Sequence, residues 1–413
     1  MFHKPTRKVI PVISACLGIG GIFFALWVWA ADRNPHRRLT ALTEQGIPIT
    51  VADLDAQSAH DGMQATELVR ALMAELAATD SGWQDLLSSD TVSAGTPTDE
   101  ELARMRAIAE NPRARELFRQ LAELPGEEPY AALGTQGDFM ERLLGVISDV
   151  RGVYRYLGVS ARYHRLQGEA ERFMEDVLLS LRTLRRGAPC LVGNLVRVAC
   201  LRITLREAAD TLSAGRFPSE TLNALDARLA ELDVHRWWEE ALRSEGAYGL
   251  DQMERQMSFA RYWPASVMYY STVDYYLDVL DYYRQHGLDV PGKAAAPSPQ
   301  KGFSAWNKLV DLALPAFEAG QNAGRTAIAE IRCLRAHVRI VEQANEKGGK
   351  AEIAWESIDL PEGEKVDPFT GTPLLLRPVD DGWLVYSVGT NLRDDGGKFD
   401  GQEDVGLRVS LPR

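Results

Sequence analysis

The sequence predicts a mainly α-helical protein with a membrane anchor at its start and a small α+β module at its end. An uncharged apolar stretch opens the chain, helical periodicity runs through its middle, and short apolar segments broken by glycine and proline fill its last fifth. The 413 residues allow two or three domains. The net charge of −12 provides no basic surface for phosphate backbones, so nucleic acid is not an expected partner.

The N-terminal anchor is predicted by a span without charge inside residues 1–38. Val9 to Ala31 is 23 residues long and contains no charged side chain, which is enough for a helix to cross about 30 Å of hydrocarbon. Basic residues flank both ends, and the short N-terminal tail favours a cytoplasmic N-terminus. We therefore expect a single-pass protein of the bacterial inner membrane with most of the chain on the periplasmic side. The alternative is a signal peptide cleaved near Ala30, which would give a secreted protein.

Residues 39–287 are predicted to form an α-helical domain of helix hairpins, either a bundle or a solenoid. Thr98 precedes three acidic residues, as an N-cap does, and Pro112 is expected to restart the chain as a new helix. Glycine and proline separate the long apolar periodicities, which indicates short turns between consecutive helices. The clearest predicted helices are 60–79, 138–167, 169–186 and 191–214.

A tyrosine-rich helix closes this domain. Residues 262–283 hold seven of the thirteen tyrosines, and Tyr269, Tyr276 and Tyr283 recur every seven residues along one helix face. With Asp274 and Asp278 they are a candidate groove for a sugar or a peptide, because tyrosine offers a flat apolar face with a polar tip. The competing interpretation, which we favour, is ordinary core packing with the carboxylates on the wet side of the helix.

The C-terminal part is predicted to be a separate module, residues 303–413, after a Pro/Ala-rich linker or loop at 288–302. A long helix is expected from Gly324 to Lys347. Short strands follow at 374–376 and 383–386, joined by a hairpin turn at Asp380 to Gly382, and a third strand is expected at 405–410.

The segment 391–404 is an acidic, glycine-rich loop. It carries five carboxylates against Arg393 and Lys398, and oxygen ligands on such a loop suit a hard cation such as calcium. The order of residues does not follow the EF-hand pattern. A solvated acidic loop is the alternative on composition alone.

The order of these segments resembles the C-terminal domain of the major pseudopilins (protein G) of type II secretion systems. The resemblance covers the last ~90 residues and lies in the long helix, the Asp367-Pro368-Phe369 turn, the Tyr386-Ser387 strand and the acidic loop. It implies a helix packed on a small antiparallel sheet, with calcium in the final loop. By position, the implied ligands are the Val388 carbonyl and the side chains of Asn391, Asp394 or Asp395, Asp400 and Asp404. The N-terminal span lacks the glutamate of a pseudopilin, so assembly into a pseudopilus is not expected.

No catalytic motif is found in the sequence, and Cys190, Cys200 and Cys333 follow neither a zinc-site nor a disulfide pattern. We expect them to be buried thiols. The predicted function is therefore a non-enzymatic, membrane-anchored protein of scaffold or partner-binding type, with another envelope protein as a possible partner. The alternatives are an envelope enzyme acting on glycans through the tyrosine helix, or an accessory component of a secretion apparatus.

Overall fold

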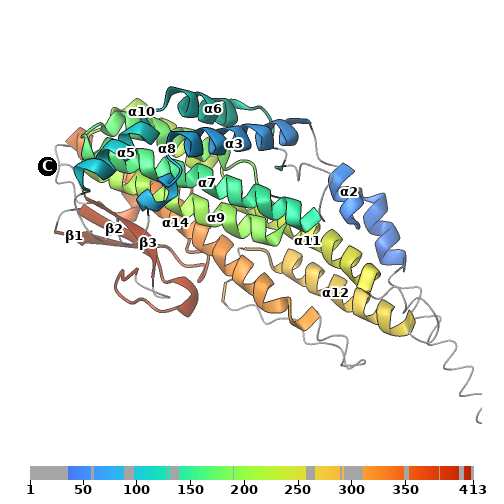
Figure 1. Ribbon diagram of the computed structural model, residues 1–413. Helices are drawn as coiled ribbons and strands as arrows, with labels where there is room; N and C mark the ends of the chain where they lie inside the picture. The colour runs from blue at the N-terminus through green and yellow to red at the C-terminus, as the bar shows by residue number, and fades with distance from the viewer. Residues whose placement is uncertain are drawn as a thin grey trace, which may run out of the picture. The chain divides into compact units, whose positions relative to one another are not determined.

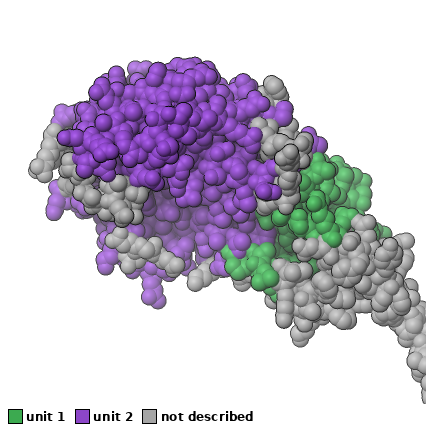
Figure 2. Space-filling view, viewed as in Figure 1, with its two compact units in different colours: residues 1–53, 245–285, 296–315 green, residues 54–244, 286–295, 316–413 purple. Residues whose placement is uncertain are grey.

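The computed structural model describes two compact units, each built from separate stretches of the chain. Unit 1 comprises Met1–Asp53, Glu245–Gln285 and Ala296–Pro315; unit 2 comprises Leu54–Ser244, His286–Ala295 and Ala316–Arg413 (Figure 2). The residues that the structure describes are 36–56, 60–87, 97–127, 129–130, 139–188, 190–256, 266–288, 291–292, 310–347, 353–380, 382–399 and 404–410.

The described part of the chain is mainly helical, with one small antiparallel sheet near the C-terminus (Figure 1). Residues 36–44 are also helical. The α-helices are α2 (Val51–Ala56), α3 (His60–Thr79), α5 (Asp99–Ala109), α6 (Pro112–Glu123), α7 (Phe139–Leu166), α8 (Ala170–Thr183), α9 (Leu191–Ala214), α10 (Ser219–Ala230), α11 (Val234–Gln256), α12 (Ser266–His286) and α14 (Leu314–Lys347). The strands are β1 (Leu375–Val379), β2 (Gly382–Ser387) and β3 (Val405–Ser410), and the short 3-10 turns are η1 (Trp83–Leu87), η3 (Trp355–Ser357), η4 (Glu362–Lys365) and η5 (Gly389–Asn391).

The helical layers of unit 2 surround α7. This helix contacts α3, α5, α8 and α9, and its residues Leu143, Val146 and Leu157 are almost fully buried. Local signals set the ends of the neighbouring helices. Thr98 and Glu101 form a capping box at the start of α5, and the Asn111 side chain caps α6, whose first residue is Pro112.

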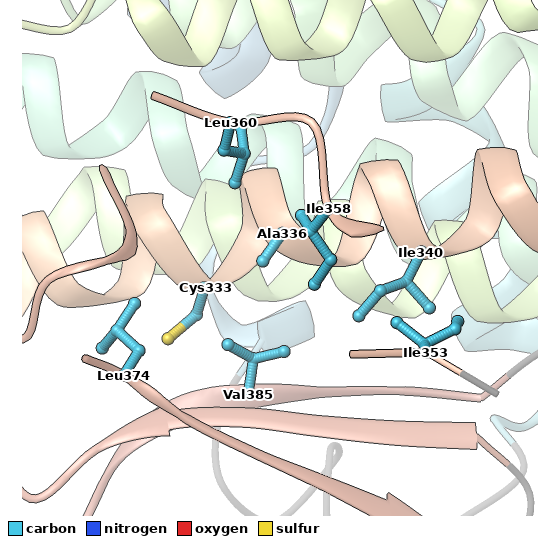
Figure 3. Packing of buried hydrophobic residues seen from close by; sticks show 8 residues of the cluster. All are labelled: Cys333, Ala336, Ile340, Ile353, Ile358, Leu360, Leu374 and Val385. Carbon is cyan, nitrogen blue, oxygen red and sulfur yellow. The ribbon is translucent and has the colours of Figure 1, made fainter. Parts of the chain in front are cut away.

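Helix α14 packs against the sheet through one apolar face. Cys333, Ala336 and Ile340 of α14 form a buried cluster with Val385 of β2 and with Leu374, just before β1 (Figure 3). The three strands are antiparallel in the order β1-β2-β3, with Leu375 opposite Tyr386 and Ser387 opposite Val405. Burial of these side chains is the main source of stability of this part of the fold.

The buried carboxylate of Asp367 joins the turn before the sheet to the end of β2. It accepts hydrogen bonds from the Phe369 amide (2.8 Å), the Ser387 hydroxyl (2.8 Å) and the Val388 amide (3.1 Å). Gly371 closes the turn with φ of +72°, a conformation that favours glycine. The unusual residue order of this run is therefore explained by a hydrogen-bonded turn.

His337 links α14 to β3 from inside the core. Its Nε2 lies 2.8 Å from the Leu407 carbonyl oxygen, and since a carbonyl only accepts, Nε2 carries the proton. Burial lowers the pKa of His337 to about 4, because the charged imidazolium is poorly solvated there, although the Leu407 carbonyl opposes the shift.

Most of the local predictions agree with the structure. The helices expected at 60–79 and 191–214 are α3 and α9, the two predicted hairpin strands and the third strand are present, and Cys190, Cys200 and Cys333 are buried free thiols. The long helix begins at Leu314 instead of Gly324, because Pro315 lies in its first turn, where a missing amide hydrogen costs nothing.

No helix among the described residues is long and apolar enough to cross a membrane. The predicted span at 9–31 and most of the predicted linker at 288–302 lie outside the described residues.

Replacing Asp367 tests the role of the turn. In Asp367→Ala, the buried Phe369 amide, the buried Ser387 hydroxyl and the half-buried Val388 amide lose their acceptor, so we expect the free energy of unfolding to fall by about 2–4 kcal/mol in urea titrations. The half-buried Thr370 bonds only to Thr372 in the same turn, so Thr370→Ala is the matched control and should change stability by about 0.5 kcal/mol or less. Equal stabilities of the two variants would contradict this role of the Asp367 carboxylate in the turn.

The lowered pKa of His337 predicts that the stability of the protein depends on pH. The folded-state pKa of about 4 lies below the ordinary value of 6.5, so the unfolded chain binds the proton first as the pH falls. The contribution of neutral His337 to the free energy of unfolding is complete above pH 6.5. It is lost progressively as the pH falls towards 4, by about 3 kcal/mol at most.

His337→Gln keeps an N–H donor but does not titrate, so urea unfolding of this variant should show a shallower loss of stability between pH 6.5 and 4 than the parent. Identical pH profiles would contradict the prediction.

Candidate functional site

A polar cleft of about 530 Å³ lies in unit 2. Its walls come from α9, from α14, from the chain after β2 and from the start of β3, so segments more than 200 residues apart in sequence meet there. The described lining residues are Arg202, Arg206, Gly292, Glu318, Gln321, Asn322, Arg325, Thr326, Glu330, Phe369, Thr390, Asn391, Leu392, Phe399, Asp404, Val405 and Gly406.

One wall of the cleft is a polar stripe along α14. The lining positions Glu318, Gln321, Asn322, Arg325, Thr326 and Glu330 follow the three- and four-residue spacing of one helix face. From Glu318 to Glu330 the helix rises by about 18 Å. Arg325 is buried and donates from Nη1 to the Gly292 carbonyl at 2.9 Å, which ties the stripe to residues 291–292.

A second wall carries two arginines of α9, which meet the α14 stripe at Glu330. Arg202 donates from Nε and Nη2 to the two carboxylate oxygens of Glu330, each at 2.9 Å. Burial raises the pKa of Glu330, and the Arg202 guanidinium opposes that shift. Arg206 follows one helical turn later with an exposed side chain, and no hydrogen bond or ion pair joins it to any described residue. The two arginines outnumber Glu330 by one charge, and Arg206 also interacts electrostatically with Glu330.

The third wall is the chain that follows β2. Leu392 has φ of 61°, a left-handed conformation that is unusual for a leucine, and its side chain is 39% exposed. Leu392 ends η5 in this conformation, and its amide donates to the Gly389 carbonyl. Phe399 is half-buried and lines the same cavity, so the cleft offers apolar surface as well as the two arginines.

The acidic loop is closed by hydrogen bonds from the protein. Asp404 accepts from the Asp395 amide (3.2 Å) and the Gly397 amide (2.6 Å). Asp394 accepts from the Tyr386 hydroxyl (3.0 Å) and from Arg377 (2.6 Å).

The remaining implied calcium ligands are only partly described. The Asn391 side chain donates to Asp395 at 2.6 Å, and the Val388 carbonyl lies at the start of η5. Asp400 lies outside the described residues, and no metal-binding group of three or more His, Cys, Asp or Glu occurs among the described ones. In this arrangement the described carboxylates serve protein donors and do not form a cage that fits a cation. Calcium binding stays a prediction.

The candidate tyrosine groove is divided between core and ion pairs. Tyr276 and Tyr283 are buried, Tyr269 is half-buried, and the Tyr276 hydroxyl donates to the Glu245 carbonyl at 2.8 Å. These contacts show no open aromatic face for Tyr276 or Tyr283.

The carboxylates of that groove converge on a single guanidinium. Asp274, Asp278 and Asp281 lie 2.6, 2.8 and 2.9 Å from the Arg38 nitrogens. Within unit 1, the spacing of the three carboxylates on α12 is therefore explained by one ion-pair network.

No sequence pattern pointed to the cleft. Arg202 and Arg206 are four residues apart on α9, and the polar positions of α14 have helical spacing, but both patterns also describe a solvated surface. Only the packing of α9 beside β3 brings these faces together with the final loop.

No protein family model matches the chain, and neither the curated proteins nor the solved structures contain a match.

Replacing Asp404 distinguishes closure of the acidic loop by hydrogen bonds from closure by bound calcium. Asp404→Ala removes the acceptor of two amides, so we expect a loss of about 2 kcal/mol or more in the free energy of unfolding. If hydrogen bonds close the loop, the loss should be the same in calcium and in EGTA, as measured by urea titration. A loss seen in calcium alone would contradict hydrogen-bond closure and support the calcium prediction.

Proposed function

We propose that this protein is a membrane-anchored partner-binding protein of the bacterial envelope, and that the cleft of unit 2 is its binding site. The observation that carries the proposal is the cleft itself, where charged, amide and apolar side chains from separate segments of the chain share one cavity. A volume of about 530 Å³ is typical of small-molecule and short-peptide sites. The uncharged stretch 9–31 supports the anchor, with the bulk of the chain on the periplasmic side.

In this proposal the C-terminal module is a pseudopilin-like domain that serves as a wall of the site. Support comes from α14 packed on the three-stranded antiparallel sheet, which is the arrangement that the resemblance implies. The long helical segment before it, α3 to α11, sets the chain apart from a polymerising pseudopilin. A role as accessory component of a type II secretion-like apparatus is the second candidate, favoured by the same module.

The glycan-hydrolysing alternative has less support. Its two carboxylate candidates, Asp274 and Asp278, both form an ion pair with Arg38. A glycosidase needs two carboxyl groups that flank the scissile bond of a sugar, whereas these two share one guanidinium.

Site-specific photo-crosslinking in cells tests the proposal. A photoreactive phenylalanine analogue at Asn322, inside the cleft, should yield a discrete adduct of the full-length chain in the washed membrane fraction. The same analogue at Met63, which is 41% exposed on α3, is the matched control and should yield none. Adducts at both positions, or at neither, would contradict a partner in the cleft, and a shortened chain in the soluble fraction would contradict the anchor.

A further inference from the structure

We propose that the Arg202–Arg206 end of the cleft binds the carboxylate of a ligand that also carries an apolar group, such as the last residue of a peptide. The inference rests on the proposed function, because it names the ligand chemistry of the same cleft. It draws on the charge of this end of the cleft, the apolar surface beside it and the length of the polar stripe.

The charges at this end leave one guanidinium available. Glu330 neutralises Arg202 through two hydrogen bonds of 2.9 Å. Asp404 is buried and its two oxygens accept from the amides of its own loop, so it is turned towards the protein. Arg206 makes no hydrogen bond or ion pair with the residues that the structure describes, and it faces solvent. A planar guanidinium suits a carboxylate because two parallel N–H···O bonds form at once.

Apolar surface lines the same cavity as the two arginines. Leu392 is exposed and has a left-handed backbone, and Phe399 is half-buried. Both line the same cavity as Arg206. A ligand with an aliphatic group next to its carboxylate would therefore bury that group on the loop wall while the carboxylate meets the guanidinium.

The polar stripe gives such a ligand room to extend. Its length of about 18 Å equals about five residues of extended peptide, each about 3.4 Å long. Asn322 and Thr326 are half-buried along it and provide donors and acceptors of the kind that peptide groups pair with. A single available guanidinium suits the one charge of a carboxylate better than the higher charge of a phosphate.

Isothermal titration of the full-length chain in detergent tests the inference with N-acetyl-L-leucine as the probe. We expect a Kd in the millimolar range for this acid and no measurable binding of N-acetyl-L-leucinamide, which has the same shape without the charge. Arg206→Gln should weaken the acid about tenfold, a change of about 1.4 kcal/mol. The exposed Arg113 of α6 lies outside the cleft, so Arg113→Gln makes the same charge change as a control and should leave the Kd unchanged.

A second variant checks the apolar contact. Leu392→Asn places a residue that tolerates the left-handed conformation, so the fold is kept while the apolar side chain is lost. It should weaken N-acetyl-L-leucine but not N-acetylglycine. A tripeptide acid, N-acetyl-Ala-Ala-Leu, binding about tenfold tighter than N-acetyl-L-leucine would identify a peptide terminus as the ligand, and equal affinities would identify a small organic acid.

The inference is overturned if the amide binds as well as the acid, if Arg206→Gln binds the acid with unchanged affinity, if inorganic phosphate binds more tightly than the acid, or if the acid does not bind at concentrations well above millimolar. Crosslinking at Asn322 reports on the proposed function separately. Adducts there without carboxylate binding would leave a partner in the cleft and reject only the carboxylate, whereas loss of both would reject the proposed function.

Discussion

The fold of unit 2 depends on the burial of α14 on more than one side. Towards the sheet, Cys333 and Ile340 pack in the apolar cluster of Figure 3. On other sides the helix carries charged residues at buried positions, and a buried charge is tolerated only when it is paired. Glu330 is paired with Arg202 of α9, and Arg335 with Asp226 of α10 at 2.8 Å. Helix α14 thus holds both the sheet and the helical layer in place, and it thereby positions the walls of the cleft.

The cleft follows from this arrangement. Since the apolar face of α14 is used by the sheet and its C-terminal half by ion pairs, the polar stripe of its N-terminal half borders the cavity. The loop wall is held just as firmly, because Asp367 and Asp404 satisfy amides on either side of η5. A site whose walls are fixed by buried hydrogen bonds is preorganised, which lowers the entropic cost of binding.

Two groups of acidic residues that suggested a catalytic or metal site in the sequence are paired with arginines in the structure. The three aspartates of α12 meet Arg38, about 240 residues away in the chain, and Asp394 meets Arg377. A sequence shows the spacing of carboxylates along a helix or a loop, but their counter-charges come from distant segments, so ligand and ion-pair interpretations cannot be separated before the fold is known. In contrast, the carboxylate proposal depends on Arg206 and Leu392, and neither residue belongs to a sequence pattern that predicts a binding site.

The sequence by itself determined the local features: the helices α3 and α9, the capped starts of α5 and α6, the three strands and the burial of the thiols. These depend on periodicity, capping and turn residues that act within a few positions of one another. The tertiary structure alone decided that Asp367 connects the turn to β2 and that α9 lies beside β3 to form the cleft. Those outcomes depend on burial and on pairing between distant residues, and the same local pattern is compatible with several such pairings.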